Sequence, residues 1–364
     1  MMRITVGCSR RNMTDRIPFV SVVMPVRNES RFITETINQL LVQDYPADRY
    51  EIIVVDGMSD DATREIVTGI SLNHSQVRLL DNPGRRSSSG RNVGFRNGKG
   101  DIFVVVDGHC YIPDDQLLKN IVDCFEKSGA DCLGRPQPLD PPGLTLFQKI
   151  VALARGSRLG HGGDSMIYGN YEGFASPVSN GAAYRREVFE KVGYVDENFD
   201  AAEDVEFNYR VEKAGLTCYT SPKLTVRYYP RENLNGLLHQ MIRYGMGRRR
   251  FTRKHPEALT LNQLIPAGFV IGFCVLLFLL GLFVTTGVVI PLVFTSIPYG
   301  IYLLLIVCEA LKVLSREGLQ SAVAIPAIQF VVHFGLGYGF ITEAARGFFY
   351  ADKKSSKTHK FSDG

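Results

Sequence analysis

An aspartate and a histidine, two residues apart, follow an apolar run in the first third of the chain. The run Ile102–Val106 is rich in β-branched residues, which is typical of a buried strand, and Asp107 and His109 come after it. In open α/β sheets, ligands bind beyond the carboxyl ends of the strands. A carboxylate and an imidazole at this spacing can face one cation there. The alternative is a turn in which Asp107 only closes the strand.

Polar residues follow two earlier apolar runs in the same way. Arg27 and Glu29 follow the first run, which ends at Pro25, and Asp56 follows the second. A carboxylate at the carboxyl end of a strand can accept hydrogen bonds from a base or a ribose. If the runs are neighbouring parallel strands, these side chains share one edge of a sheet with Asp107.

Two acidic residues, Glu203 and Asp204, open a helical stretch that runs to Ala214. Acidic residues are common at helix N-termini because they complement the helix dipole, and this is the simpler interpretation. A carboxylate that acts as a general base in a cleft needs similar placement. Arg91 lies in the Gly90–Gly94 segment, where it could contact a phosphate or a base, or be an exposed structural arginine.

An amide and a guanidinium lie three residues apart at Gln240 and Arg243, and Tyr244 follows them. On a helix this spacing places the first two groups on one face. Together they could bracket a diphosphate, because a guanidinium binds phosphate oxygens in pairs. A surface helix without a ligand is the alternative.

The elements that must position these residues alternate between strands and helices up to about residue 225. Strands are predicted at Val20–Pro25, Glu51–Val55, Val77–Leu80 and Asp101–Val106, and helices at Phe32–Val42, Ala62–Ile70 and Asp115–Lys127. Such alternation predicts an α/β fold, in which a mostly parallel sheet has right-handed crossovers and flanking helices.

Three apolar segments follow Pro256. They are Leu264–Phe283, Val288–Ala310 and about Leu319–Ile341. Each has about 20 residues, the length that spans a bilayer. Basic residues cluster at 248–254, so the positive-inside rule predicts that the preceding part of the chain is cytoplasmic and that the connection at 285–291 faces out. The lysine-rich tail disagrees with an odd number of spans. The third segment also carries Gln329 and His333, so it could be re-entrant or packed inside a bundle.

Residues 231–255 connect the two parts. Apolar residues fall at helical spacing here, and they are Leu234, Leu237, Leu238, Met241, Ile242 and Gly245. A helix with this stripe and a basic end is typical of the membrane interface, where anionic lipids attract it. An amphipathic helix that covers the sheet is the alternative.

Composition excludes several classes of protein. The 364 residues favour two units, and 41 Lys and Arg against 37 Asp and Glu leave no large basic footprint for a nucleic acid. Seven scattered cysteines, without a Cys-x-x-Cys pair, suit a reducing compartment. The residues up to Pro18 lack the apolar core of a signal peptide, so we expect the first part of the chain to stay in the cytoplasm.

In their order and spacing, these motifs resemble the family 2 glycosyltransferases, which have the GT-A nucleotide-sugar fold. The resemblance is closest to the membrane-anchored branch with the succinoglycan-type exopolysaccharide glucosyltransferases. The matching segments are Val20–Glu29, Val55–Asp61, Gly90–Gly94, Gly181–Phe189, Glu203–Asp204 and Gln240–Tyr244. Two positions depart from the family pattern: His109 replaces the second aspartate of Asp-x-Asp, and Tyr244 replaces a tryptophan. An imidazole can still bind Mn²⁺ or Mg²⁺, with a preference for the softer ion.

The resemblance implies a metal-dependent, inverting hexosyltransferase. It would move a sugar from a nucleoside diphosphate sugar, with a UDP-sugar favoured, to a lipid-linked saccharide or glycan in polysaccharide biosynthesis. Asp204 would be the catalytic base, and Glu203 would orient the base or the acceptor. Donor-binding residues would be Pro25, Arg27, Glu29, Asp56, Arg91 and Asp107. Asp107 and His109 would hold Mn²⁺ or Mg²⁺, and Gln240, Arg243 and Tyr244 would contact the diphosphate or the acceptor.

The implied organisation is that of a multi-pass protein of the cell membrane with a cytoplasmic catalytic domain. The predicted units are an N-terminal tail at 1–19, the catalytic domain at 20–230, an amphipathic interfacial segment at 231–258, a transmembrane region of about three spans at 259–345 and a polar tail at 346–364. One alternative is a processive polysaccharide synthase, which so few spans disfavour because an export channel needs more helices. The other is a non-catalytic, membrane-anchored scaffold that binds a nucleotide sugar.

Overall fold

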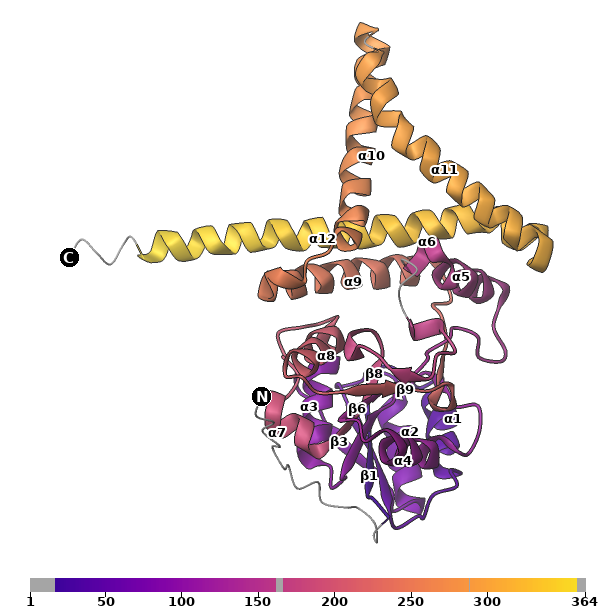
Figure 1. Ribbon diagram of the computed structural model, residues 1–364, viewed down its shortest axis with the longest axis vertical. Coiled ribbons are helices and arrows are strands. Elements are labelled where there is room, and N and C mark those ends of the chain that lie inside the picture. Colours follow the sequence, from indigo (N-terminus) through magenta and orange to yellow (C-terminus); the bar gives the residue numbers. More distant parts are fainter. Residues whose placement is uncertain (1–16, 162–165, 288, 359–364) are drawn as a thin grey trace, which may run out of the picture.

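The computed structural model describes residues 17–161, 166–287 and 289–358, so most of the predicted N-terminal tail lies outside the described residues. Residues 17–230, here called the N-terminal domain, form a layered α/β unit, and four long helices follow it (Figure 1). The helices stand on one side of this domain, which therefore turns a single face toward them.

The N-terminal domain is built on an eight-stranded sheet with the order β3-β2-β1-β4-β8-β6-β9-β7. The strands are β1 Val20–Val26, β2 Tyr50–Asp56, β3 Val77–Asp81, β4 Ile102–Val105, β5 Cys110–Tyr111, β6 Cys132–Gly134, β7 Gly173–Phe174, β8 Gly181–Arg185, β9 Cys218–Thr220 and β10 Arg227–Tyr228. β3, β2, β1 and β4 run parallel, which confirms the predicted α/β fold. β8 runs antiparallel to both β4 and β6, and β5 and β10 form a separate ribbon.

Helices cover both faces of this sheet. They are α1 Ile33–Leu41, α2 Thr63–Asn73, α3 Ser87–Asn97, α4 Leu117–Ser128, α7 Arg186–Val192 and α8 Glu203–Lys213. Two further helices, α5 Leu146–Gly156 and α6 Arg158–His161, pack with the C-terminal helices instead of the sheet. The side-chain period of two in β1 separates two cores. Val22 and Met24 pack with residues of α1 and α4 on one face, whereas Val23 packs with residues of α3, α7 and α8 on the other.

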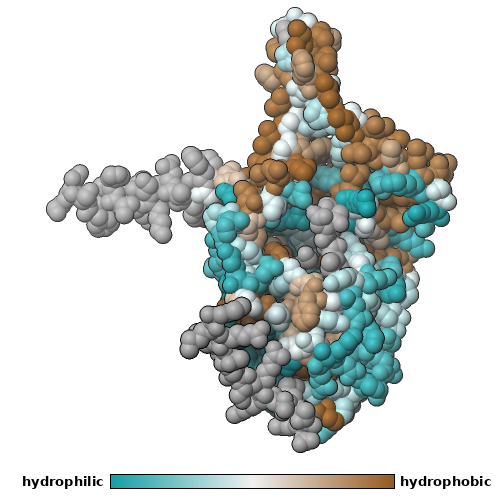
Figure 2. Space-filling model, in the orientation of Figure 1, coloured by the Kyte–Doolittle hydropathy of each residue, from teal (hydrophilic) through white to brown (hydrophobic). Residues whose placement is uncertain are grey.

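Three of the C-terminal helices are long and apolar enough to cross a membrane, judged by length and composition over the described residues. They are α10 Leu261–Thr286, α11 Ile290–Glu317 and α12 Leu319–Thr358, of which residues 319–347 form the apolar part. α10 and α11 form a hairpin that projects away from the N-terminal domain, and α12 crosses its base (Figure 1). The visible surface of the hairpin is hydrophobic, whereas that of the N-terminal domain is largely hydrophilic (Figure 2).

The remaining long helix, α9 Leu234–Lys254, lies beside α12. Leu237 and Met241 of its predicted apolar stripe pack against α5 and α12, so protein rather than lipid buries this part of the stripe, whereas Leu234 is exposed. Glycines allow the two helices to touch through their backbones. A Cβ atom at Gly245 would meet the backbone of Leu336, and one at Gly339 would meet the backbone of Ile242.

Candidate active site

The carboxyl ends of β2, β1 and β4 meet at one edge of the sheet, because these parallel strands are neighbours. Asp56 is the last residue of β2, and Pro25 lies opposite Val55 near the end of β1. Arg27 and Glu29 follow β1, while Asp107 and His109 follow β4. The polar residues that the sequence places after three separate strands therefore lie at one edge.

Asp56 is buried and already has partners. The Ser59 hydroxyl donates to its Oδ1 at 2.5 Å, and Arg64 Nη1 lies 3.5 Å from its Oδ2. These contacts fix the carboxylate at the edge where the sequence predicts a base or ribose site.

Glu29 and His109 contact each other directly, with Glu29 Oε1 at 2.8 Å from His109 Nδ1. Burial lowers the pKa of His109, but the hydrogen bond to Glu29 and the charges of Glu29 and Asp107 outweigh it, so the pKa is raised. Because Nδ1 is engaged, Nε2 is the ring nitrogen that can take a cation. A carboxylate behind a histidine ligand is a common feature of metal sites.

The donor set fits a cation that a substrate helps to hold. Among the residues that the structure describes, no three His, Cys, Asp or Glu side chains are grouped to bind a metal. Asp107 and His109 would supply two ligands, and substrate phosphate oxygens or water would complete the shell. Mg²⁺ is usually bound in this way, through few protein ligands together with phosphates.

Asp107 also lies near a buried cation that the sequence did not indicate. Arg135, directly after β6, is 3 % exposed, and its Nη2 donates to the Tyr228 hydroxyl at 2.9 Å. Its Nε and Nη1 have no partner among the described residues. Burial lowers the pKa of Arg135, but electrostatic interactions with Tyr228, Cys110 and Asp107 and the hydrogen bond to Tyr228 outweigh it and raise the pKa. A buried positive charge therefore interacts electrostatically with the predicted metal ligand Asp107.

Arg91, on α3, lies beside both acidic residues at the start of α8. Its Nη2 is 3.6 Å from Glu203 Oε1, and both side chains are largely buried. Burial lowers the pKa of Arg91, but the charges of Glu203, Asp204 and Asp107 outweigh it and raise the pKa. Burial in turn raises the pKa of Glu203. Arg91 is therefore the shared counter-charge of three carboxylates rather than an exposed structural arginine.

The neighbours of Arg91 in the sequence explain how α3 presents it. A Cβ atom at Gly94 would meet the side chain of Val23, so glycine lets α3 approach β1 closely. The Asn92 side chain donates to Val195 O at 2.8 Å and accepts from Val195 N–H at 3.0 Å. The Gly-Arg-Asn-x-Gly segment thus fixes the helix on two sides and points its arginine at α8.

Glu203 and Asp204 begin α8, as the sequence predicts, but neither is its N-cap. That position belongs to Ala202, whose φ of 61° lies in the left-handed region that side chains rarely adopt. Asp204 is half-buried, and its Oδ1 accepts the backbone N–H of Val205 at 2.8 Å. An unusual backbone conformation therefore holds both carboxylates, and such conformations cluster at functional sites.

The three predicted diphosphate or acceptor residues lie on α9. Gln240 Nε2 donates to the Tyr244 hydroxyl at 3.3 Å. Arg243 Nε lies 3.4 Å from Asp200 Oδ2, and Arg243 Nη2 donates to Asp200 O at 2.9 Å. Asp200 belongs to the loop before Asp204, so α9 contacts the segment that leads into the predicted base.

A buried ionic cluster joins α8 to the end of α9. The Glu206 carboxylate contacts Arg210 at 3.0 Å, Lys254 at 2.7 Å and His255 at 3.1 Å. Burial raises the pKa of Glu206, but these three partners outweigh it, so the pKa is lowered. The helix that carries Asp204 is thus tied to the membrane-side helices.

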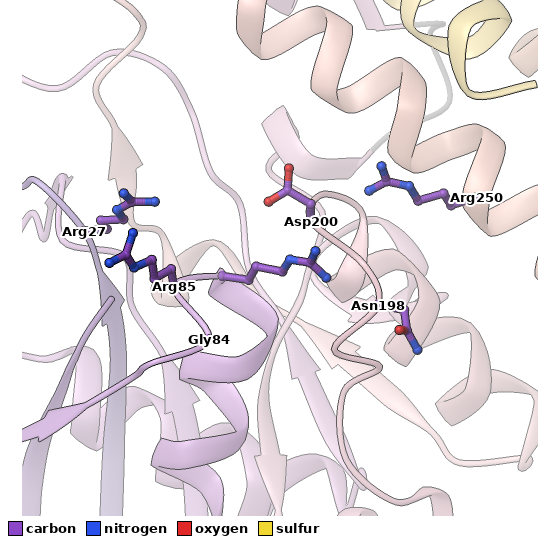
Figure 3. A pocket seen from close by; sticks show the side chains of 7 residues that line it. Arg27, Gly84, Arg85, Asn198, Asp200 and Arg250 are labelled. Carbon is purple, nitrogen blue, oxygen red and sulfur yellow. The ribbon is translucent and has the colours of Figure 1, made fainter. Parts of the chain in front are cut away.

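A cavity of about 730 Å³ lies between the sheet edge and α9. Its lining residues are Arg27, Gly84, Arg85, Arg86, Asn198, Asp200 and Arg250. Figure 3 shows Arg27 and Arg85 on one side of the cavity and Asp200, Asn198 and Arg250 on the other. Four guanidinium groups and one carboxylate give the lining a formal charge of +3. Guanidinium groups match the geometry of phosphate oxygens, so the cavity suits a phosphate-bearing ligand.

Arg27 is the one residue among the predicted site residues that lines this cavity; Asp107, His109 and Asp204 do not. Arg85 and Arg86 were missed, although they follow β3 and therefore reach the same edge of the sheet. Their position after a parallel strand was the available signal. From the sequence, Arg250 is predicted only as part of the basic cluster at 248–254, because it follows no strand of the sheet.

Comparisons with known proteins agree with this fold. Residues 18–247 match the family described as "Glycosyltransferase like family 2". The chain is 27% identical, over 90% of its length and 98% of the relative's, to dolichyl N-acetyl-alpha-D-glucosaminyl phosphate 3-beta-D-2,3-diacetamido-2,3-dideoxy-beta-D-glucuronosyltransferase of Methanococcus voltae. It is 33% identical, over 67% of its length and 73% of the relative's, to the succinoglycan biosynthesis protein ExoA of Rhizobium meliloti (strain 1021).

The fold is also similar to a solved structure, the mannosyltransferase PcManGT from Pyrobaculum calidifontis in complex with GDP-Man and Mn²⁺. The TM-score is 0.55 at 18% identity, over 92% of this chain and 88% of that one. The likeness supports the GT-A fold, and the relationship to ExoA confirms the resemblance to the succinoglycan branch. The family match covers well over half of the chain, and the protein therefore belongs to glycosyltransferase family 2.

Proposed function

We propose that this protein is a membrane-bound, inverting glycosyltransferase that moves a sugar from a nucleoside diphosphate sugar to a lipid-linked or glycan acceptor in polysaccharide biosynthesis. The observation that carries the proposal is the burial of Arg91 at 3.6 Å from Glu203, where it also interacts electrostatically with Asp204 and Asp107. Family membership supports it, as do the names of the relatives, which refer to a dolichyl phosphate-linked sugar and to succinoglycan.

The donor would bind at the carboxyl edge of the sheet. Pro25, Arg27, Glu29 and Asp56 would line the base and ribose site, and we favour a uridine base. The guanidinium groups of the cavity beside Arg27 would attract the diphosphate.

The reaction would be a single displacement at the anomeric carbon. Asp204 takes the proton of the acceptor hydroxyl while the hydroxyl oxygen forms the new bond to that carbon. The bond from the anomeric carbon to the diphosphate oxygen breaks, and the nucleoside diphosphate leaves with the electron pair. One displacement inverts the configuration. Glu203, held by Arg91, orients the acceptor or the base.

Asp107 and His109 would hold Mn²⁺ or Mg²⁺. The bound cation would neutralise the charge that develops on the leaving diphosphate. Glu29 fixes the His109 ring for this role through their 2.8 Å contact. Gln240, Arg243 and Tyr244 would complete the site from α9 when the acceptor binds.

The proposed location is the cell membrane, with the catalytic domain in the cytoplasm where nucleotide sugars are made. The proposed units are the catalytic domain at 20–230, the segment at 231–258 and the membrane region at 259–345. The apolar C-terminal helices and the basic residues before α10 support this arrangement.

The test uses the full-length protein in detergent with a panel of nucleotide sugars, an acceptor extract and Mn²⁺ or Mg²⁺. One donor should release nucleoside diphosphate, and excess chelator should abolish this release. Asp107→Ala should lower turnover by at least ~10²-fold, the scale of losing a main electrostatic stabiliser. Asp60→Ala is the matched control, because Asp60 is an exposed carboxylate after the neighbouring strand β2. Full activity in chelator would contradict the metal assignment, and no release from any donor would contradict the transferase.

Two further measurements sharpen the result. His109→Asp restores the family's ligand and should keep activity while changing the preferred metal; an inactive variant would give His109 another role. The length of the product separates a transferase that adds one sugar from a processive synthase, because only the synthase extends one acceptor repeatedly.

A further inference from the structure

The apolar stretch of α12 lies along the N-terminal domain instead of leading away from it. Gln329 Nε2 donates to Ala154 O at 3.0 Å, and His333 Nε2 lies 2.9 Å from Leu159 O. These contacts join α12 to α5 and α6. About 21 Å further along the axis, at about 1.5 Å per residue, Glu343 contacts α9. Because Gln329 and Glu343 both contact helices on this side of the N-terminal domain, the part of α12 between them lies flat against those helices.

The α10–α11 hairpin behaves differently. Only 11% and 6% of its apolar windows are buried within the protein, compared with 44% for α12. The two helices have 26 and 28 residues, so each is about 40 Å long, enough for a hydrocarbon core of about 30 Å. The hairpin projects away from the N-terminal domain and its visible surface is hydrophobic, so it suits a lipid environment (Figures 1 and 2). With the hairpin in lipid, the boundary between lipid and water would lie at the level of α9 and α12.

A second cavity, of about 510 Å³, lies between α9 and α12 at this level. It is lined by Arg250, Arg253, Glu343, Arg346 and Gly347. The Glu343 carboxylate is buried and lies 3.2 Å from both Arg250 and Arg253, while Arg346 is exposed. Three guanidinium groups and one carboxylate give the lining a formal charge of +2. A positive cavity at the depth of lipid head groups suits an anion that is attached to a lipid.

Arg250 connects this cavity to the candidate active site. The same side chain lines the larger cavity together with Arg27, Arg85 and Asp200 at the sheet edge. One turn earlier on α9, Gly247 packs against the backbone of Ala201, just before Glu203. An anion bound between α9 and α12 would therefore lie next to the loop that holds the predicted catalytic carboxylates.

We propose that Arg250, Arg253 and Arg346 form a binding site for the phosphate group of a lipid-linked acceptor. A lipid phosphate stays in the head-group layer, where this cavity lies, whereas a water-soluble donor can reach the sheet edge directly. Guanidinium groups bind phosphate oxygens in pairs, and this cavity presents three of them. The assignment rests on the proposed function in one respect, which is that the acceptor is lipid-linked.

The test measures binding without a donor. Full-length protein in nanodiscs of neutral phosphatidylcholine is titrated with farnesyl monophosphate and with farnesol, which differ only in the phosphate. The wild-type protein should prefer the phosphate. The double substitution Arg253→Gln with Arg346→Gln should weaken farnesyl monophosphate binding by about tenfold or more, the scale of losing a charge-assisted hydrogen bond. Farnesol binding should not change.

The control is Lys312→Gln with Arg316→Gln, which removes the same charge near the end of α11, outside the cavity. An equal loss in the control would mean that the arginines act only through the general charge of the surface, and would overturn the site. Equal competition by phosphatidylglycerol would show a general lipid site, and equal competition by UDP or GDP would show a donor site. Either result would also overturn the proposal.

The outcome can be separated from that of the proposed function. Binding needs no turnover, so a protein that prefers farnesyl monophosphate but transfers no sugar would contradict only the transferase. In an active enzyme, the double variant should raise the KM for a phosphate-bearing lipid acceptor and leave kcat and the donor KM unchanged. A changed donor KM would contradict the site while leaving the transferase intact.

Discussion

Asp204→Asn is the sharpest test of the proposed mechanism, because the structure separates its structural role from its chemical one. Asp204 Oδ1 accepts the Val205 N–H at 2.8 Å, and an asparagine Oδ1 can accept the same bond. Arg91 keeps its contact with Glu203. The substitution therefore leaves the shape of the site and removes only the ability to take a proton.

The two roles predict losses of very different size. If Asp204 only stabilises the start of α8, removing its charge costs about 0.3–1 kcal/mol of helix stability and leaves turnover near the wild-type value. If Asp204 is the base, turnover falls by about 10²–10⁴-fold, which corresponds to about 3–5 kcal/mol of lost transition-state stabilisation. A loss of this size cannot come from the helix alone.

The assay measures donor binding and transfer on the same preparation. Nucleotide-sugar affinity should survive in the variant while transfer collapses, because the sheet edge that would bind the donor is unchanged. Asp48→Asn is the control for loss of charge, because Asp48 is an exposed carboxylate in the loop between α1 and β2. Near-wild-type transfer by Asp204→Asn would refute the mechanism, and loss of both binding and transfer would point to a structural fault.

Three further predictions concern the framework of the protein. Gly339→Ala should destabilise the protein by about 1–3 kcal/mol, seen as a lower Tm in detergent, because the new methyl group meets the backbone of α9, whereas Gly268→Ala has free space and should not. Glu206→Gln should cost about 1.5–3 kcal/mol at neutral pH, because it removes the buried carboxylate that pairs with Arg210, Lys254 and His255. Burial raises the pKa of Glu206, but its cationic partners lower it below its ordinary 4.5. The wild-type protein therefore keeps this stabilisation above about pH 4.5 and loses it as the pH falls through the lowered pKa. Unfolding curves of the variant should lack this acid-dependent loss of stability. A cysteine at Thr286 should react with an impermeant reagent in intact cells, and one at Ser87 should not; the opposite labelling would reverse the proposed topology.

Much of the sheet edge could be predicted, because its signals are local. Asp56 and Asp107 each follow a long, apolar strand, and a parallel sheet brings such ends together. The short strands β6 and β9 have three residues each, too few to show a period of two, so the antiparallel half of the sheet could not be read from the sequence.

The partners of the site residues could not be predicted, because they come from distant parts of the chain. Glu29 and His109 lie 80 residues apart, and the cavity joins Arg85 to Arg250. Hydropathy also cannot tell a helix that spans the membrane from one whose apolar face packs on protein. It gives α12 the same signature as a spanning helix, since an apolar face packed on α9 and an apolar face in lipid have the same composition.

The contact between Gly247 and the backbone of Ala201 has a mechanical consequence. A Cβ atom at Gly247 would lie 2.5 Å from Ala201 O, so α9 contacts the loop before Glu203 directly through its backbone at this point. A displacement of the α9–α12 pair would therefore shift the Glu203 and Asp204 carboxylates by nearly the same amount. A misplacement of about 1 Å can lower the rate by about 10²-fold. A bilayer that is too thin or too thick for the α10–α11 hairpin would displace the α9–α12 pair. The enzyme's turnover should therefore vary with bilayer thickness, while its unfolding temperature stays nearly constant.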